Sequence, residues 1–303
     1  MVMRPLALIA TASALVAAAG AGATPAAQSQ AELVYVSGTG KSARAYVVRE
    51  DGTGRRRLTA SRFSESELRY SRDGRRIAFT SIRTRSNQDV YVMNADGSGV
   101  RRITTHPAPD LQPTWSPDGR RIAYVSLRSG NFKVYVANAD GTRHRLLTRT
   151  PRWVSDSSPA WSPDGGWIAF SSSRLKDGNP EIFKMRPDGS SVTRLTFTNT
   201  SGEVSPDDGF PAWSPDGRSI LFSSTRADGQ HDLWVMGADG RRPRRITRTP
   251  ASDDWHASFS PDGRRIVFNA LPREGRAADV YVVSVDGTGL RRVVRGLWPV
   301  WKP

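Results

Sequence analysis

Residues 113–119 read Pro-Thr-Trp-Ser-Pro-Asp-Gly, and close variants of this stretch recur along the chain, each followed by an apolar run and a second Asp-Gly pair. The first Asp-Gly pair occurs five times, at Asp73, Asp118, Asp164, Asp216 and Asp262. The second occurs six times, at Asp51, Asp96, Asp140, Asp188, Asp239 and Asp286. The unequal counts indicate that one repeat unit is divided between the two ends of the chain, which is how a ring of repeats is closed.

The repeat length and its strand chemistry predict propeller blades. An aromatic residue stands before each Ser-Pro-Asp-Gly or its equivalent, 42 to 52 residues from the next, at Tyr70, Trp115, Trp161, Trp213, Phe259 and Trp301. Each unit offers four short β segments, which in the second full unit are Pro113–Ser116, Arg121–Ser126, Lys133–Ala137 and His144–Thr148. A period of this length built from strands favours a propeller over a helical solenoid. We expect the aromatic residue to wedge between adjacent blades.

The two termini supply complementary parts of one blade. After Trp301 the last unit has only a first strand, Pro299–Trp301, while the first unit begins with Leu33–Ser37, Ala45–Val48 and Arg56–Thr59 and has no first strand. Joining them removes the free sheet edges. The sequence therefore predicts an all-β protein, a six-bladed β-propeller of four-stranded antiparallel blades over residues 32–303, closed by a composite blade from both termini.

The repeated phrases carry a family resemblance. Ser-Pro-Asp-Gly followed by Ile-Ala-Phe, then Tyr-Val-Met, then Asp-Gly and Arg-Leu-Thr resembles the WD40-like repeat (PD40) of the TolB β-propeller family, over residues 32–303. The resemblance implies a propeller that acts by binding proteins in the cell envelope. TolB proteins carry a small α/β domain before the propeller, whereas here the expected signal peptide leads almost directly into the first strand. We therefore do not carry over the contacts that the family makes through that domain.

The first residues predict export. Arg4 precedes a continuous apolar stretch, Leu6–Ala19, and Ala21-Gly22-Ala23 offers a small-x-small cleavage site, so residues 1–23, or as far as 27, predict a secretory signal peptide. We expect a periplasmic or secreted protein with no transmembrane segment in its mature part. The formal net charge of +15 favours an anionic partner, but export argues against nucleic acid. The chain has no cysteine, which excludes disulfides, thiolate chemistry and a lipid-attachment cysteine.

Charged residues recur on one face of the predicted disc. Five residues before the aromatic stands an acid in every complete unit: Glu65, Asp110, Asp156, Asp208 and Asp254. Four residues after the second-strand aromatic stands an arginine in four of them: Arg83, Arg128, Arg174 and Arg226. The fifth complete unit has Pro272 there, and the composite unit has Gly296 and Thr39 at the two positions. We expect these acids and arginines, the acid–arginine ring, to pair with one another and to shape a binding face. A direct role in binding is the open alternative.

Other candidate sites are weaker. His106, His231 and His256 share the same face, and propellers that resemble oligogalacturonate lyase hold a metal on three histidines, but the offsets here differ between units. The loops 177–181 and 228–232 place carboxylates around an Asp-Gly, which fits plain turns better than calcium sites. Arginine doublets that precede or open the fourth strands are expected to protect an exposed sheet edge, or alternatively to form a basic rim for anionic polymer. No hydrolase, metalloprotease or nucleotide-binding motif is present.

These observations lead to one main hypothesis. We expect a monomeric, non-catalytic propeller without a cofactor that binds a protein or peptide across its loop face, with the loop 197–210 contributing selectivity. Two alternatives remain at this stage: an enzyme with a metal in the channel, of the polysaccharide lyase or lactonase type, and a basic module that binds anionic envelope polymer.

Overall fold

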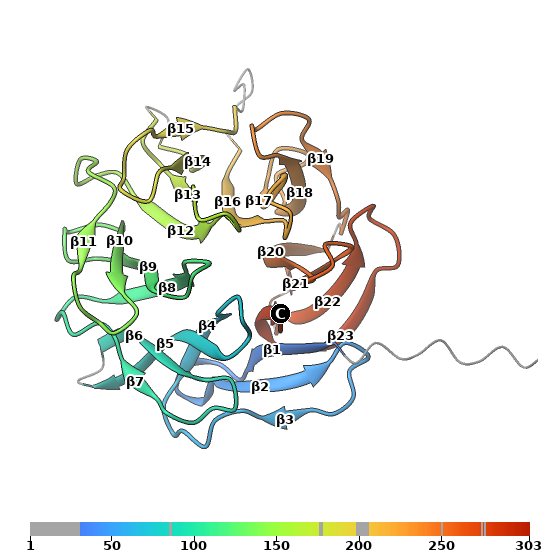
Figure 1. Ribbon diagram of the computed structural model, residues 1–303. Coiled ribbons are helices and arrows are strands. Elements are labelled where there is room, and N and C mark those ends of the chain that lie inside the picture. Colours follow the sequence, from blue (N-terminus) through green and yellow to red (C-terminus); the bar gives the residue numbers. More distant parts are fainter. Residues whose placement is uncertain are drawn as a thin grey trace, which may run out of the picture.

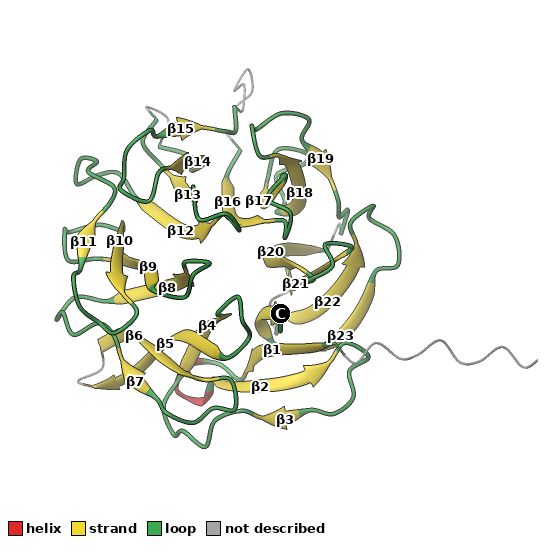
Figure 2. Ribbon diagram, viewed as in Figure 1, coloured by secondary structure: helices red, strands yellow, loops and turns green. Residues whose placement is uncertain are grey.

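The strands form six separate blades around a central axis. The computed structural model describes residues 31–84, 87–175, 178–197, 206–249, 251–273, 275 and 277–303. Within these residues every blade is a four-stranded antiparallel sheet (Figure 1; Figure 2), which confirms the predicted fold class. The predicted signal peptide and residues 198–205 of the loop 197–210 lie outside the described residues. No helix in the described part of the chain is long and apolar enough to cross a membrane.

We number the blades from the composite one, innermost strand first. Blade 1 contains β24 (Leu297–Trp301), β1 (Glu32–Ser37), β2 (Arg44–Arg49) and β3 (Arg56–Arg57), with a short 3-10 turn, η1 (Gly40–Ser42), before β2. Blade 2 contains β4 (Glu65–Tyr70), β5 (Arg76–Thr84), β6 (Asn87–Asn94) and β7 (Arg101–Arg102). Blade 3 contains β8 (Asp110–Trp115), β9 (Arg121–Ser126), β10 (Lys133–Asn138) and β11 (Arg145–Leu146). Blade 4 contains β12 (Asp156–Trp161), β13 (Ile168–Ser172), β14 (Glu181–Met185) and β15 (Thr193–Arg194). Blade 5 contains β16 (Asp208–Trp213), β17 (Ser219–Ser224), β18 (Asp232–Gly237) and β19 (Arg244–Arg245). Blade 6 contains β20 (Ser252–Phe259), β21 (Arg265–Pro272), β22 (Asp279–Ser284) and β23 (Arg291–Arg295).

The composite blade closes the ring as predicted. Strand β24 pairs antiparallel with β1, with Val300 opposite Val34 and Trp301 opposite Leu33. The Lys302 amide donates to the Glu32 carbonyl oxygen at 2.9 Å and extends this pairing by one bond. On the other side, the buried Glu50 of blade 1 forms ion pairs with Arg265 and Arg291 of blade 6. Backbone pairing and buried ion pairs therefore join the chain ends.

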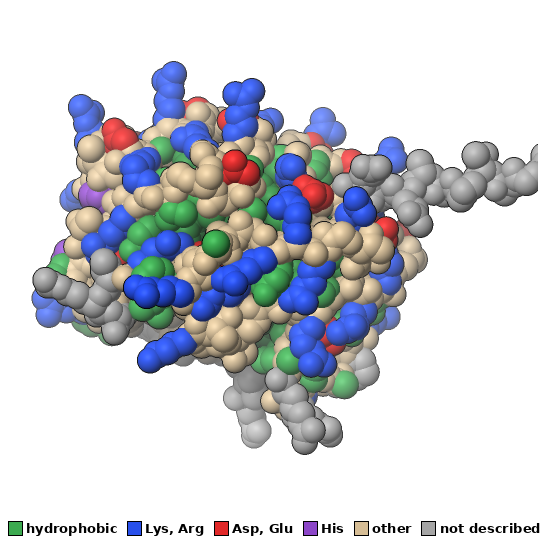
Figure 3. Space-filling model, turned by 90° about the horizontal axis from the view of Figure 1, so that it is seen from below, with side chains coloured by type: hydrophobic (Ala, Val, Ile, Leu, Met, Phe, Trp, Pro, Cys, Tyr) green, Lys and Arg blue, Asp and Glu red, His purple; other side chains and the backbone are tan. Residues whose placement is uncertain are grey.

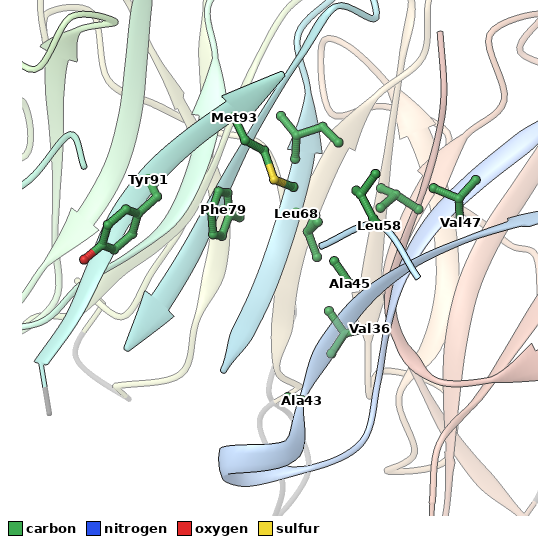
Figure 4. Close-up of a cluster of buried hydrophobic side chains, with 11 residues drawn as sticks. Val36, Ala43, Ala45, Val47, Leu58, Leu68, Phe79, Tyr91 and Met93 are labelled. Atoms are coloured by element: carbon green, nitrogen blue, oxygen red, sulfur yellow. The ribbon is translucent and has the colours of Figure 1, made fainter. Parts of the chain in front are cut away.

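Apolar side chains between the blades form the core. Figure 4 shows one such cluster, in which Val36, Ala45 and Leu58 of blade 1 pack against Leu68 and Phe79 of blade 2. The end-of-strand aromatics wedge between blades as expected. Trp115 packs among residues of blades 2 and 3, and its indole Nε1–H donates to the Arg69 carbonyl oxygen at 3.2 Å. The sheets are therefore buried on both faces, which explains why the second strands are apolar without alternation.

The arginine doublets hold neighbouring blades together. The first arginine reaches the turn after the third strand of the next blade, as Arg101 does to the carbonyl oxygens of Ala139 and Asp140 and Arg244 to that of Val285. The single arginine Arg145 makes the same contact with the Asp188 carbonyl oxygen. The second arginine of a doublet pairs with an acid on its own blade, as Arg102–Asp89, Arg245–Asp232 and Arg292–Asp279, and the single arginine Arg194 of blade 4 pairs with Glu181 in the same way. The fourth strand is indeed the outer edge. Figure 3 shows Lys and Arg side chains scattered over the rim of the disc.

Removing the closing strand should cost more stability than trimming an ordinary terminus. Deletion of residues 297–303 removes β24 and the buried Trp301, and each large buried apolar side chain contributes roughly 1.5–3 kcal/mol. Since 1 kcal/mol shifts Tm by about 2–4 °C in a domain of this size, the loss of Trp301 together with the partly buried Leu297, Trp298 and Val300 should lower Tm by about 10 °C in a thermal melt. The control deletes only the exposed Lys302 and Pro303 and should lower Tm by a few degrees at most. Equal melting of the 297–303 deletion and the intact protein would refute the composite blade.

Candidate functional site

The acid–arginine ring forms intra-blade ion pairs at the start of the inner strands. Each acid is the first residue of its strand rather than a loop residue in blades 2 to 5, and in blade 6 Asp254 is the third residue of β20. Each arginine forms an ion pair with the carboxylate of its own blade. The distance from Nη2 to the nearest carboxylate oxygen is 2.9 Å for Arg83–Glu65, 3.0 Å for Arg128–Asp110, 3.0 Å for Arg174–Asp156 and 2.6 Å for Arg226–Asp208. In each pair, Arg Nε also donates to the hydroxyl of the serine two residues before it.

Burial separates the two members of the ring. All five carboxylate residues are 0% exposed, so a partner on this face does not touch them directly. Their oxygens bind the preceding blade as well: Glu65 accepts hydrogen bonds from the Thr59 hydroxyl and from the Ala45 amide. The first strands therefore begin earlier than predicted, as β8 (Asp110–Trp115) does relative to the expected Pro113–Ser116, and they include the acids. The arginine side chains are 16–21% exposed, and their part in binding stays a prediction.

Blade 6 keeps the acid without its partners. Ala270 and Pro272 occupy the places of the serine and the arginine. Among the described residues, hydroxyl groups bond to Asp254 in place of a guanidinium, with Thr249 at 2.7 Å and Ser252 at 3.4 Å. Burial, with a smaller contribution from the nearby Asp232 carboxylate, raises the pKa of Asp254 to about 7. In blade 1, Gly296 replaces the acid because the Tyr35 ring fills this space. A Cβ at Gly296 would lie 2.4 Å from that ring.

The inner strands also carry a second ring, one that the sequence did not reveal. Two residues after each acid position, a non-glycine residue has a left-handed backbone with φ between 49° and 54°, and there the pairing of the inner strand shifts register. A β-bulge of this kind redirects a side chain. Five of the six residues line one cavity, and the sixth, Trp298, bonds to the His256 ring. We call the six the channel-lining set: Glu67, Gln112, Ser158, Phe210, His256 and Trp298.

The channel-lining set has a polar half and an aromatic half. On the polar side, the backbone N–H of Gln112 donates a hydrogen bond to Glu67 Oε2, and the backbone N–H of Ser158 donates one to the side-chain oxygen Oε1 of Gln112, both at 2.8 Å. On the aromatic side, the Phe210 and His256 ring centroids lie 4.4 Å apart, and those of His256 and Trp298 lie 5.8 Å apart. The sixfold backbone thus presents two different walls to one channel.

The imidazole ring of His256 is neutral, and one of its nitrogens accepts a hydrogen bond while the other donates one. The Trp298 indole Nε1–H donates to His256 Nε2 at 3.1 Å, which leaves His256 Nδ1 to donate to Asn269 Oδ1 at 3.2 Å. Burial, together with the Arg69 charge across the channel, lowers the pKa of His256 to about 3. Both ring nitrogens are occupied, and the group stays neutral at physiological pH.

Arg69 lies two residues beyond Glu67 and lines the same channel. It borders both a cavity of about 180 Å³ within the channel-lining set and a second pocket of about 400 Å³ that opens toward the Asp-Gly hairpins. At that end Arg72 stands where the other five blades have proline, and its Nη1 donates to the Pro163 carbonyl oxygen of blade 4 at 2.6 Å. Arg72 therefore narrows the hairpin end of the channel.

The other predicted candidates do not converge. Within the described residues no group of three or more His, Asp or Glu side chains is placed to hold a metal ion. His231 stacks on Trp255 at 3.8 Å, and His106 Nδ1 accepts the Ala108 amide in another loop. In the loop 228–232, both Asp228 and Asp232 pair with Arg245, which fits a plain turn. Asp177, in the other loop, lies outside the described residues.

The channel-lining set was missed for a physical reason. Four of its members directly precede a proline, and that position normally adopts an extended backbone, so nothing predicted a left-handed residue. One signal could have found it. Between the repeated acid and the repeated aromatic, this position changes chemical type from unit to unit, which is expected where a scaffold carries a site.

The chain is similar to a known protein family and to several solved structures. The TolB beta propeller domain model (PD40) matches residues 22–154, 111–210 and 208–299. The chain belongs to this family. Solved structures similar to it include TolB from Acinetobacter baumannii (21% identity, 91% of this chain and 67% of that chain, TM-score 0.75) and a TolB from Agrobacterium tumefaciens (23%, 88% and 90%, 0.68). An oligogalacturonate lyase in complex with manganese is more distant (13%, 86% and 72%, 0.53). These identities establish a shared fold.

The unpaired acid of this TolB-family propeller should make stability depend on pH. Because the folded pKa of Asp254 is raised from 3.8 to about 7, its protonated form stabilises the fold, and this contribution is lost as pH rises through 7. Asp254→Asn cannot ionise. We measure the free energy of unfolding of both proteins in denaturant titrations. The value for Asp254→Asn minus the value for the wild type should increase by on the order of 3 kcal/mol from pH 4.5 to pH 8.

A second variant rebuilds the missing partners. Ala270→Ser with Pro272→Arg restores the arrangement of blades 2 to 5 and should flatten the same pH dependence. Parallel pH profiles for the wild type, Asp254→Asn and the rebuilt variant would contradict the assignment.

Proposed function

We propose that this propeller is a non-catalytic scaffold that binds a protein or peptide segment across its loop face, outside the cytoplasm. The observation that carries the proposal is the placement of its most exposed aromatic residues. Trp153 and Phe197 are 81% and 70% exposed, and both lie on blade-joining loops, after β11 and β15. Aromatic side chains are enriched in protein interfaces and dominate their binding energy.

The charge around these residues indicates the character of the partner. Arg149 and Arg152 are exposed on the same loop as Trp153, and the Arg194 guanidinium stacks on Phe197 at 4.7 Å. A partner segment that combines apolar and acidic side chains fits this surface, since complementary charge speeds encounter and rejects wrong partners. The remaining basic rim makes anionic envelope polymer the second ligand class for testing.

The channel supports a binding role over a catalytic one. A general base at neutral pH needs a free ring nitrogen and a pKa near 7. His256 has neither, since both nitrogens are engaged and its pKa is about 3. Membership of the TolB propeller family supports the binding scaffold. The predicted signal peptide supports a location in the cell envelope.

Site-specific crosslinking tests the proposal directly. A photo-crosslinking residue at position 153 should capture one defined envelope protein, because the indole there is free to contact a partner. The matched control places the same residue at Val192, which is 43% exposed on the hairpin face, and should capture nothing in common.

The captured protein is then purified and titrated against variants. Trp153→Ser and Phe197→Ser should each weaken binding roughly tenfold or more while leaving Tm unchanged, since neither side chain is buried. Unaltered affinity in both variants would place the interface elsewhere. Turnover of a polysaccharide or lactone by the purified protein, together with no captured partner, would overturn the proposal.

A further inference from the structure

Arg69 is a cation in the channel without a carboxylate partner. Its guanidinium donates one hydrogen bond, from Nη1 to the neighbouring Leu68 carbonyl oxygen at 2.9 Å, and no Asp or Glu in the described part of the chain comes within ion-pair distance of it. Burial lowers the pKa of Arg69, although its side chain still borders the channel. Among the described residues, two of the three guanidinium nitrogens of Arg69 therefore have no hydrogen-bond partner and can bond to a ligand.

The acid nearest to Arg69 in the sequence, Glu67, accepts hydrogen bonds from other groups. Glu67 Oε2 accepts the Gln112 amide at 2.8 Å and the Thr80 hydroxyl at 2.7 Å. Burial raises the pKa of Glu67, so its charge is already disfavoured there. The Glu67 carboxyl is thus held by other donors, and Arg69 lines the same cavity as a separate group.

The rest of the cavity is suited to an apolar group. Phe210, Pro211, Ala212 and Ala257 line it together with the neutral His256 ring. Its volume of about 180 Å³ is smaller than the roughly 300–1,000 Å³ of sites that bind drug-sized molecules. It therefore fits one ring or one residue, and the Arg72 contact across the hairpin end favours entry from the loop face.

We propose that the channel is a binding site for a monocarboxylate attached to an apolar group, with the carboxylate held by Arg69 and the apolar group held by the Phe210–His256 wall. A guanidinium binds a carboxylate through two parallel hydrogen bonds. A single cation beside Glu67 matches one negative charge better than the two of a phosphate. The ligand is either a free acid or the carboxyl-terminal residue of a polypeptide, and the site does not depend on the loop-face partner.

Titration with small probes tests the site. Binding of 3-phenylpropionate to the purified protein is measured by isothermal titration and ligand-observed NMR, beside its neutral analogue 3-phenylpropanamide and beside acetate. We expect 3-phenylpropionate to bind at least tenfold more tightly than either, since one lacks the charge and the other the ring. Equal binding of the acid and the amide, or no binding of the acid at millimolar concentration, would overturn the proposal.

Variants assign the binding to Arg69. Arg69→Gln should weaken 3-phenylpropionate binding by roughly ten- to a hundred-fold, the usual effect of losing a charged hydrogen-bond partner. Arg69→Lys keeps the charge and should retain part of the affinity, which separates loss of the site from loss of the fold. Arg152→Gln removes the same charge from the loop surface and should bind as the wild type does. Equal affinity in all four proteins would contradict the assignment.

A peptide pair distinguishes the two ligand sources. Gly-Gly-Phe with a free carboxyl terminus binds, and its amidated form does not, if a polypeptide terminus enters the channel. If neither peptide binds while 3-phenylpropionate does, the ligand is a free acid, and the site stands. Binding of the amidated peptide as tightly as the free one would count against a carboxylate site.

Discussion

The antiparallel pairing of β24 with β1 is the constraint on which the rest of the molecule depends. Every blade buries both faces against its neighbours, so a gap anywhere in the ring would expose two apolar faces. The pairing of Val300 with Val34 and of Trp301 with Leu33 closes that gap, and the Glu50 ion pairs with Arg265 and Arg291 reinforce it. The channel exists only in the closed ring, because its lining comes from the inner strands of all the blades.

Repetition explains which features could be predicted. The number of blades, the composite blade, the aromatic wedges and the pairing of Arg128 with Asp110 all follow from positions that recur along the chain. The aromatic position recurs in all six units and the acid–arginine pair in four of them. The start of the first strands was predicted too late, because the acids that begin them are polar and resemble loop residues in the sequence. The double role of the arginine doublets also depends on contacts between blades, which the order of residues within one unit does not contain.

The candidate site lies where the repeat breaks its own rules. The left-handed residues before proline contradict the local preference of the chain, and strained backbone of this kind persists only where the surrounding structure enforces it. Each bulge turns a side chain toward the channel, and there the six units differ: Glu67 and Ser158 on one side, Phe210 and Trp298 on the other. Arg69 and Arg72 are likewise single departures from the repeat, as are Ala270 and Pro272, which leave Asp254 without the serine and arginine of the other blades. The positions that repeat in the blades build the family fold, and the positions that differ between blades form the candidate site.

Native-state hydrogen exchange tests the central claim, that the ring is one cooperative unit closed by β24. Under conditions where exchange reports opening free energies, the amides of Val34 and Val300 should exchange with the same free energy as those of Tyr124 and Val134 in the middle of blade 3, because opening the closure is equivalent to global unfolding. The account would be contradicted if β24 and β1 exchanged through an opening several kcal/mol less costly while blade 3 stayed protected.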